Sequence, residues 1–208
     1  MRTPSMKGKA TRRRIIDAAA DLFHKQGVQA TSPQQIMETS QTGKSQLYHH
    51  FRSKGGLVHE VLQHHIQSIR EGSAAIDYEI TSWSDLQRWF RAHAGLQEKY
   101  RMTRGCPFGT IGNEVTENDE LIRRDLELLF EVVRNKLAGF FLRERTRGRL
   151  GPGANEAALA DFCISSIQGA MLLGKIRRDR GTVDLAIDQA LNYLAGFRRS
   201  VPRRRGSA

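Results

Sequence analysis

The sequence has little of what several other classes of protein require. Its 208 residues include only two cysteines, Cys106 and Cys163, too few for a disulfide framework, so we expect a reducing, cytoplasmic environment. No long apolar stretch follows the basic N-terminus, and we therefore expect no secretory signal. The most apolar region, residues 163–176, is interrupted by serine, glutamine and lysine, which argues against a membrane span.

Signatures of catalysis and metal binding are also lacking. Gly43-Lys44-Ser45 resembles the end of a phosphate-binding loop, but that motif needs a preceding strand and a glycine where Glu38 stands. The five histidines between residues 49 and 65 contain no pair at the i,i+3 or i,i+4 spacing of helical metal ligands. No Ser/His/Asp or paired-carboxylate arrangement is visible either. We expect no metal, no cofactor and no enzymatic activity.

The positive charge is concentrated at the two ends of the chain. Residues 1–70 contain 11 Lys and Arg against 4 Asp and Glu, a net charge of +7. Residues 71–197 have a net charge of −1, and residues 198–208 carry five Arg and no acid. A basic head and tail on a near-neutral body are typical of nucleic-acid binding, although a solubilising surface would also be basic.

Helical periodicity dominates the sequence, and no segment shows convincing strand alternation. We predict an all-α fold, with an N-terminal three-helix helix-turn-helix domain and a C-terminal helical ligand-binding and dimerisation domain. The expected boundaries are a flexible basic arm at 1–8, the helix-turn-helix domain at 9–69, the second domain at 70–198 and a disordered basic tail at 199–208.

Two short helices separated by a tight turn form the strongest local signal. Ser32 can cap the first, with Pro33 at its first position and Gln35 completing a capping box. Residues 41–43 are expected to form a turn. The second helix of the pair, which is the third of the chain, is expected over 44–51. Ser53 is expected to cap a long fourth helix that runs to the high seventies. The apolar anchors of the pair would be Ile36, Met37, Leu47 and Phe51.

This pair has the form of a DNA-binding helix-turn-helix, whose second helix enters the major groove. Gln and Ser side chains can bond base edges, while Lys and Tyr suit phosphates. The basic residues between 7 and 14 favour this reading over an ordinary helical hairpin with a polar face. The expected DNA-binding residues of this region are Arg13, Arg14, Ser32, Gln34, Thr42, Gly43, Lys44, Ser45, Gln46, Tyr48 and His49.

Residues 12–62 resemble the DNA-binding domain of TetR-family transcriptional regulators. The matching strings are Ile15-Ile16-Asp17-Ala18-Ala19, Leu22-Phe23, Gly27, Thr31, Ile36, Leu47-Tyr48-His49-His50-Phe51, Ser53-Lys54 and Leu57-Val58. The resemblance implies phosphate contacts at Lys44, Tyr48 and Lys54. It implies base or nearby phosphate contacts at Gln46 and His49. Two residues depart from the family pattern: Gln41 stands where glycine is usual, and Gly43 replaces a side-chain cap.

The second half resembles the LmrA-like subgroup of that family. Gly105-Cys106-Pro107-Phe108-Gly109 with Asn113-Glu114, and Ser165-Ser166-Ile167-Gln168-Gly169-Ala170, carry this resemblance. It implies a homodimer whose DNA affinity falls when a small molecule enters each C-terminal domain. The partners would be a two-fold symmetric double-stranded operator, a small apolar ligand and a second copy of the chain, with no membrane.

The C-terminal half predicts a helix that opens at residues 82–85 and is broken by residues 105–109, then helices over about 110–115, 118–145 and 155–178. A last helix is expected to open at Thr182 or Asp184 and to run to about Arg198. In the helix over 118–145, we expect Leu121, Leu128, Val132, Leu137 and Phe141 to face the core. The helix from Asn155 is apolar nearly all round, which suits a dimer interface but also the central helix of a monomer. The expected dimer residues are Ser166, Ala170, Gly174, Ile187, Leu191 and Leu194.

A ligand pocket is expected where aromatic residues of several helices converge, with residues 106–114 on the ligand side. Its predicted lining is Trp89, Phe90, His93, Cys106, Phe108, Ile111, Phe130 and Phe162, each of which also suits simple core packing. We interpret the chain as a ligand-responsive DNA-binding regulator, most simply a repressor released by an apolar or aromatic molecule. Two alternatives remain at this point: a C-terminal module that only dimerises and answers to a protein partner, and an enzyme that uses the pocket catalytically.

Overall fold

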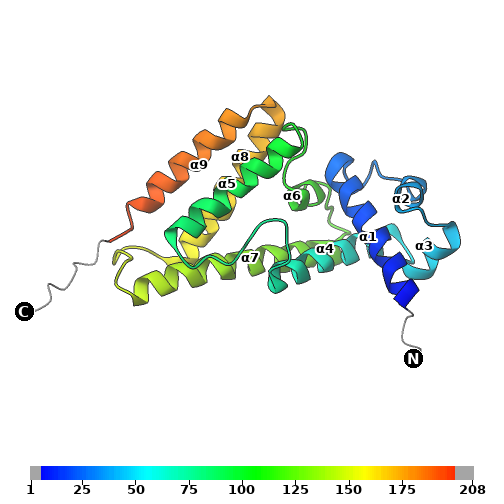
Figure 1. Ribbon diagram of the computed structural model, residues 1–208, viewed down its shortest axis with the longest axis horizontal. Coiled ribbons are helices and arrows are strands. Elements are labelled where there is room, and N and C mark those ends of the chain that lie inside the picture. The colour runs from blue at the N-terminus through cyan, green and yellow to red at the C-terminus, as the bar shows by residue number, and fades with distance from the viewer. Residues whose placement is uncertain (1–5, 200–208) are drawn as a thin grey trace, which may run out of the picture. The chain divides into compact units, whose positions relative to one another are not determined.

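A computed structural model describes residues 6–199, and within this range the chain forms nine helices and no sheet (Figure 1). The prediction of an all-α fold is confirmed. The helices are α1 (Met6–Gln26), α2 (Pro33–Ser40), α3 (Lys44–His50), α4 (Lys54–Glu71), α5 (Trp83–Lys99), α6 (Pro107–Gly112), α7 (Glu120–Thr146), α8 (Glu156–Arg177) and α9 (Arg180–Ala195). One isolated antiparallel bridge joins Leu150 to Arg198.

The helix starts lie where side-chain caps predict them. The hydroxyls of Ser32, Ser53 and Ser82 accept hydrogen bonds from the backbone N–H groups of Gln35, Gly56 and Asp85. Asn155 caps α8 through the N–H of Ala158. Each cap satisfies one of the N–H groups that a helix leaves unpaired at its N-terminus, so the start is set by local chemistry.

Three predicted boundaries are wrong. α4 ends at Glu71 rather than in the high seventies, because Gly72 takes a left-handed conformation (φ 70°) that stops the helix. The last helix begins at Arg180, not at Thr182 or Asp184, because the Asp179 carboxylate accepts from two N–H groups of its first turn. α6 likewise starts earlier than predicted, with Pro107 in its first turn.

The first of two compact units combines residues 6–74 with residues 103–131. α1 packs against α2, α3, α4 and α6, and Phe23, Ile36 and Leu62 are among the fully buried side chains. The unit therefore extends beyond the predicted boundary near residue 70, because the α6 segment packs on α1. Of the predicted basic arm, residues 6–8 belong to α1, and residues 1–5 lie outside the described range.

The second unit combines residues 75–102 with the described chain from Val132. α8 and α9 lie side by side along most of their length, and α5 packs against both (Figure 1). Phe90, Leu86 and Cys163 are fully buried there. Arg199, the first residue of the predicted disordered tail, is held in this unit, because its N–H donates to the carbonyl of Arg149 at 2.9 Å. The remaining tail residues, 200–208, lie outside the described range.

The buried face of α7 differs from the predicted one. Leu121 is exposed, and Leu128 and Val132 are half-buried, whereas Leu137 and Phe141 are buried as expected. The buried face instead runs through Ile122, Leu126, Leu129, Val133, Leu137 and Phe140. The apolar residues of α7 form two adjacent stripes along the helix. The stripe that packs inward is shifted by one residue from the predicted stripe.

α8 is long and apolar enough to cross a membrane by length and composition, with a mean hydropathy of 1.4 in its most apolar window. Its inward side is nevertheless occupied by protein: Cys163, Ile167 and Met171 are buried within the second unit. The opposite side carries Leu172, Leu173 and Ile176, which are exposed in the single chain. The composition of α8 therefore reflects two apolar faces, one buried and one exposed in the single chain.

Candidate nucleic-acid interface

The two helices of the motif are joined by a turn of defined geometry. The Ser32 and Gln35 side chains form a reciprocal capping box at the start of α2. Gln41 ends this helix in a left-handed conformation (φ 53°), as expected for a residue standing where glycine is usual. Leu47 and Phe51 are buried together with Ile36 of α2, so α3 is held against its neighbours by its apolar face.

The opposite face of α3 is polar and open. Lys44, Ser45 and His49 are exposed, and Tyr48 keeps 48% of its surface accessible. Within residues 6–199, no hydrogen bond or ion pair engages the side chains of Lys44, Ser45 or Tyr48. A cation, a hydroxyl and a phenol thus lie free on one short helix. This is the donor set that phosphates and base edges require.

Other predicted contact residues already have partners in the chain. Gln46 accepts a hydrogen bond from the N–H of Gly43 (3.2 Å), while the first turn of α3 receives no side-chain cap, because Gly43 has no side chain. Gln34 donates to Glu38, and Thr42 shares a hydrogen bond of 2.7 Å with Ser40. Polar side chains used in this way stabilise the motif itself, and they would have to exchange these bonds to contact DNA.

The basic residues beside the motif divide in the same manner. Arg13 binds both oxygens of Asp17 one turn along α1, and Lys54 donates to the carbonyl of Gln29 at 3.2 Å. Arg14 is exposed without a partner among the described residues. Arg52, which sequence reasoning missed, is likewise exposed directly after α3. Only its place between two motif residues could have indicated it.

The surroundings of one histidine in this region, His50, lower its pKa. Burial lowers the pKa of His50, and the neighbouring His49 and Arg12 lower it further. Arg12 itself pairs with Glu60 and lies over the Phe51 ring, 5.6 Å from its centroid. The Arg12 cation therefore joins α1, α3 and α4 rather than facing solvent alone.

The segment around α6 contacts the helix-turn-helix domain. The Glu114 carboxylate accepts from the backbone N–H of Gln29 at 2.8 Å, and His24 hydrogen-bonds the carbonyl of Gly105 at the same distance. Arg104 pairs with Asp21 of α1. These polar contacts fix the segment to α1 and to the α1–α2 turn, so the placement of residues 106–114 on the ligand side stays a prediction.

The predicted ligand-binding residues fall into two sets. Trp89, Phe90 and His93 are buried on α5, where the Trp89 and His93 rings lie 4.6 Å apart. Cys106, Phe108, Ile111 and Phe130 belong to the other unit. Phe162 contacts the Tyr193 ring between α8 and α9. The convergence on one pocket therefore stays a prediction.

Most of the predicted dimer residues are buried inside the single chain. Ala170, Gly174, Ile187 and Leu194 are buried, and Ser166 and Leu191 are half-buried. Gly174 allows the closest approach, since an added Cβ would lie 2.4 Å from a Val183 methyl. At Gly174 the close neighbour is therefore α9 of the same chain, and a role of these residues between two chains stays a prediction.

A capped helix pair with an open polar second helix, followed by a helical C-terminal unit, defines a DNA-binding regulator of the helix-turn-helix class. Residues 15–61 match the bacterial regulatory proteins of the tetR family, and residues 84–190 match the tetracyclin repressor-like C-terminal domain. The chain belongs to the TetR family of transcriptional regulators.

Known relatives agree with this assignment. The chain is 33% identical to the HTH-type transcriptional regulator YvkB of Bacillus subtilis, over 77% of this chain and 81% of that protein. It is 25% identical to the HTH-type transcriptional repressor DhaR of Mycobacterium sp. strain GP1, over 83% and 86%. A TetR regulator from Chloroflexus aurantiacus has the same fold, with a TM-score of 0.80, 21% identity and coverage of 95% and 100%. The expectation that the chain is not an enzyme is confirmed by these regulators.

Proposed function

We propose that this regulator is a repressor that binds a two-fold symmetric operator as a homodimer and is released by a small apolar or aromatic molecule. The observation that carries the DNA-binding part is the open face of α3, where Lys44, Ser45 and Tyr48 have no partner within the described chain. Support for repression comes from DhaR, which is named a repressor and matches most of the chain.

The residues of this face take distinct roles. Lys44 and the Tyr48 hydroxyl bind phosphates, with Arg14 and Arg52 adding cations beside them. Ser45 and His49 approach base edges, and Gln46 exchanges its bond to Gly43 for one to a base. The residues whose side chains already bond within the chain act at the margin of the contact. They are Lys54, Arg13, Ser32, Gln34 and Thr42.

The homodimer forms through the outer faces of α8 and α9. Leu172 and Ile176 on α8, and Leu185 and Tyr193 on α9, are exposed large apolar side chains on two helices that pack together. Such faces suit a four-helix interface around a two-fold axis. A dimer places its two recognition helices about 34–36 Å apart, one turn of B-DNA.

The effector binds in the C-terminal half and shifts the dimer between two arrangements of its recognition helices. It must prefer the arrangement that does not fit the operator, since a ligand with equal affinity for both cannot release DNA. The buried Trp89, Phe90 and His93 of α5 support an apolar or aromatic ligand. The LmrA-like character of this half and a cytoplasmic location are parts of the same proposal.

The test is DNA binding to the region upstream of the protein's own gene and to random duplex, measured across salt concentrations. Lys44→Ala should weaken binding to both and reduce the slope of log K against log salt by about 0.9 for each phosphate that Lys44 neutralises. Tyr48→Phe should weaken both with an unchanged slope. Lys99→Ala, exposed in the other unit, is the matched control and should bind as the wild type does. Equal affinity of the wild-type protein for the two duplexes would refute specific regulation.

Ligand response is tested separately by thermal unfolding with a panel of apolar and aromatic compounds. A compound that binds the native state raises the unfolding temperature by mass action and should release the operator at the same concentrations. Stabilisation without release would leave the dimer bound and would contradict induction by that compound. If no compound of a broad panel stabilises the protein or releases the operator, control by a protein partner is favoured instead.

A further inference from the structure

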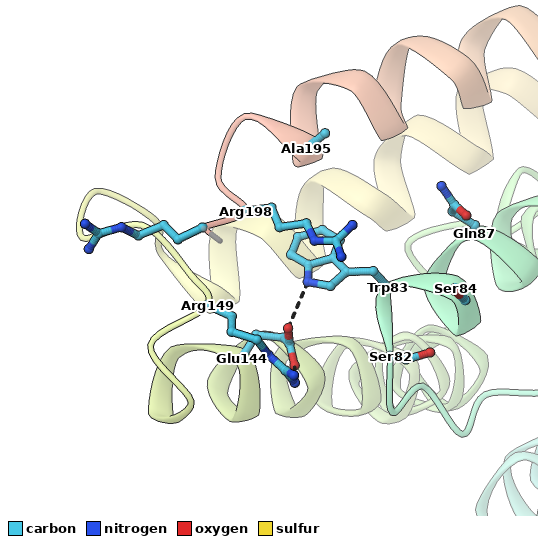
Figure 2. A pocket seen from close by; sticks show the side chains of 9 residues that line it. Ser82, Trp83, Ser84, Gln87, Glu144, Arg149, Ala195 and Arg198 are labelled. Carbon is cyan, nitrogen blue, oxygen red and sulfur yellow. Dashed lines mark hydrogen bonds and ion pairs between the residues drawn. The ribbon is translucent and has the colours of Figure 1, made fainter. Parts of the chain in front are cut away.

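A cavity lies in the C-terminal unit, and none of the residues assigned to DNA or to the apolar effector lines it. It has a volume of about 650 Å³, within the range of small-molecule sites. Figure 2 shows its walls: the start of α5 with Trp83, the end of α7 with Glu144, the loop after it with Arg149, and the chain beyond α9 with Arg198. Its full lining is Ser82, Trp83, Ser84, Gln87, Glu144, Arg149, Ala195, Arg198 and Arg199.

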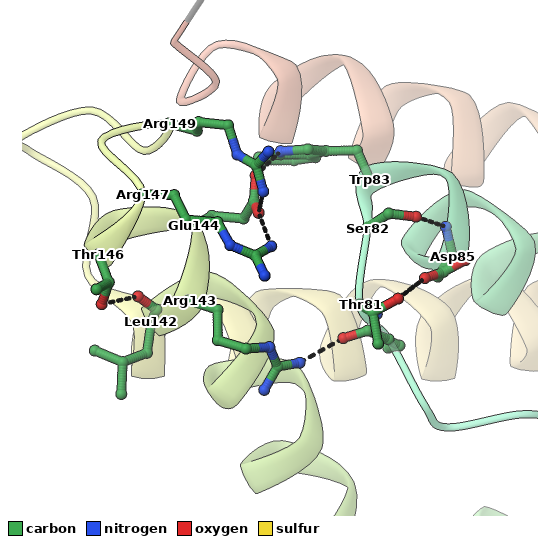
Figure 3. A network of polar contacts seen from close by, with 11 residues as sticks. Thr81, Ser82, Trp83, Asp85, Leu142, Arg143, Glu144, Thr146, Arg147 and Arg149 are labelled. Atoms are coloured by element: carbon green, nitrogen blue, oxygen red, sulfur yellow. Dashed lines mark hydrogen bonds and ion pairs between the residues drawn. The ribbon is translucent and has the colours of Figure 1, made fainter. Parts of the chain in front are cut away.

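A buried carboxylate holds one wall of this cavity in place. Glu144 is 0% exposed, and it accepts a hydrogen bond of 2.8 Å from the Trp83 indole N–H (Figure 3). It also pairs with Arg149 and, at 3.4 Å, with Arg147. A fully buried carboxylate is stable only when it is paired, so these bonds fix the indole and the Arg149 guanidinium relative to each other.

The cavity carries more positive charge than Glu144 can balance. Arg198 lies over the Trp83 ring, 5.8 Å from its centroid, without an acidic partner among residues 6–199. Arg199 has no acidic partner in that range either. The Nε atom of Arg149 is buried and makes no hydrogen bond, although a buried guanidinium N–H is costly to leave unsatisfied. Arg198, which has no acidic partner in that range, and Arg149, which keeps one unsatisfied donor, therefore line the same cavity as Arg199.

The nearby acidic side chains do not neutralise these groups. Asp85, in the first turn of α5, accepts from the N–H and the hydroxyl of Thr81 (Figure 3). It also pairs with Arg88. It is not part of the cavity lining. The hydroxyl of Ser84 and the amide of Gln87 add neutral polar groups at the rim. The arrangement is that of an oxyanion site with an aromatic wall.

We propose that this cavity binds a small organic anion, whose carboxylate or phosphate group pairs with Arg198 and Arg149 beside the Trp83 ring. Guanidinium groups suit both oxyanions, because their planar donors match the spacing of the oxygens. The bound anion connects the start of α5 to the end of α9, and so it stabilises the second unit. The site takes a charged ligand, in contrast to the apolar effector proposed above, and it does not depend on that proposal.

Isothermal titration of the full-length protein without DNA tests the site with three probes. Benzoate supplies a carboxylate, phenyl phosphate supplies a phosphate, and benzamide is the neutral match of benzoate. We expect at least one of the two anions to bind and benzamide to bind at least tenfold more weakly. Arg198→Gln should weaken anion binding about tenfold, the loss typical of one charge-assisted hydrogen bond. Arg177→Gln removes the same charge from an exposed position outside the cavity and should leave affinity unchanged.

Quenching of tryptophan fluorescence provides a second readout, because Trp83 borders the site. It should accompany anion binding in the wild-type protein and be lost in Arg198→Gln. Benzamide binding as tightly as benzoate, or equal affinity of Arg198→Gln and the wild type, would overturn the proposal. Failure of both anions to bind, with weaker binding of random duplex DNA by Arg198→Gln, would overturn it too and assign these arginines to the nucleic-acid backbone. None of these outcomes bears on whether an apolar compound releases the operator.

Discussion

Replacement of Gly174 by alanine tests the packing that joins α8 to α9. A Cβ added at this position would lie 2.4 Å from Val183 Cγ2 and 3.1 Å from Met102 Cε. Met102 can move, but Val183 is fully buried and β-branched, with little freedom to yield. Overpacking of a core costs about 1–3 kcal/mol, while glycine to alanine within a helix gains about 1 kcal/mol. We therefore expect a net loss of up to about 2 kcal/mol in the free energy of unfolding.

The assay is urea unfolding followed by tryptophan fluorescence at a fixed protein concentration, since Trp83 and Trp89 both lie in the second unit. Gly95→Ala is the matched control, because Gly95 is exposed on α5 with nothing within 4 Å of an added Cβ. It should raise stability by up to about 1 kcal/mol. In the double variant Gly174→Ala/Val183→Ala, the new methyl has room, so the two effects should not add. A Gly174→Ala protein as stable as Gly95→Ala would refute the close approach of the helices.

Three further predictions concern single side chains. Ser32→Ala removes the cap of α2 and should lower the unfolding free energy by about 1 kcal/mol, seen as a lower thermal midpoint. Burial lowers the pKa of His93 from 6.5 to about 4, so on acidification the unfolded chain takes up a proton that the native state refuses. The free energy of unfolding should therefore fall as the pH is lowered from 6.5 to 4, by up to about 1.4 kcal/mol per pH unit. Urea titrations at several pH values measure this dependence, and His93→Gln should make it weaker. Trp83→Phe deprives buried Glu144 of a donor and should cost about 1–3 kcal/mol by the same assay, with Tyr193→Phe as a control that keeps its stability.

Helix starts could be predicted from the sequence because a cap is a local event. Ser32, Ser53, Ser82 and Asn155 each bond an N–H three residues further on, and the sequence contains everything this requires. The α2–α3 turn was predictable for the same reason. Asp179 was missed although it caps α9 in the same way, because Thr182 and Asp184 compete with it as start signals. Local chemistry thus gives the elements, and ambiguity arises where several capping residues lie close together.

Which face of a helix is buried, and which side chains pair, depends on long-range contacts that cannot be read from the sequence. Leu121 and Ile122 are neighbours on α7, and only the packing decides that Ile122 is buried while Leu121 is exposed. Glu144 reads as an ordinary surface charge in a run of arginines, yet it is fully buried and bonded to Trp83, 61 residues away. Gly174 reads equally well as a contact between chains or within one. Such assignments need long-range geometry, which periodicity alone cannot supply.

Pairing within the chain also lowers the positive charge that the N-terminal segment can offer to DNA. Arg12 is paired with Glu60 and Arg13 with Asp17, while Lys54 donates to a backbone carbonyl. A cation already paired in the free protein releases fewer counterions on binding phosphate, because part of its charge is neutralised beforehand. The net charge of +7 over residues 1–70 therefore overstates the cations available to the operator. Those that remain open, such as Lys44 on α3, determine where the phosphate backbone meets the protein.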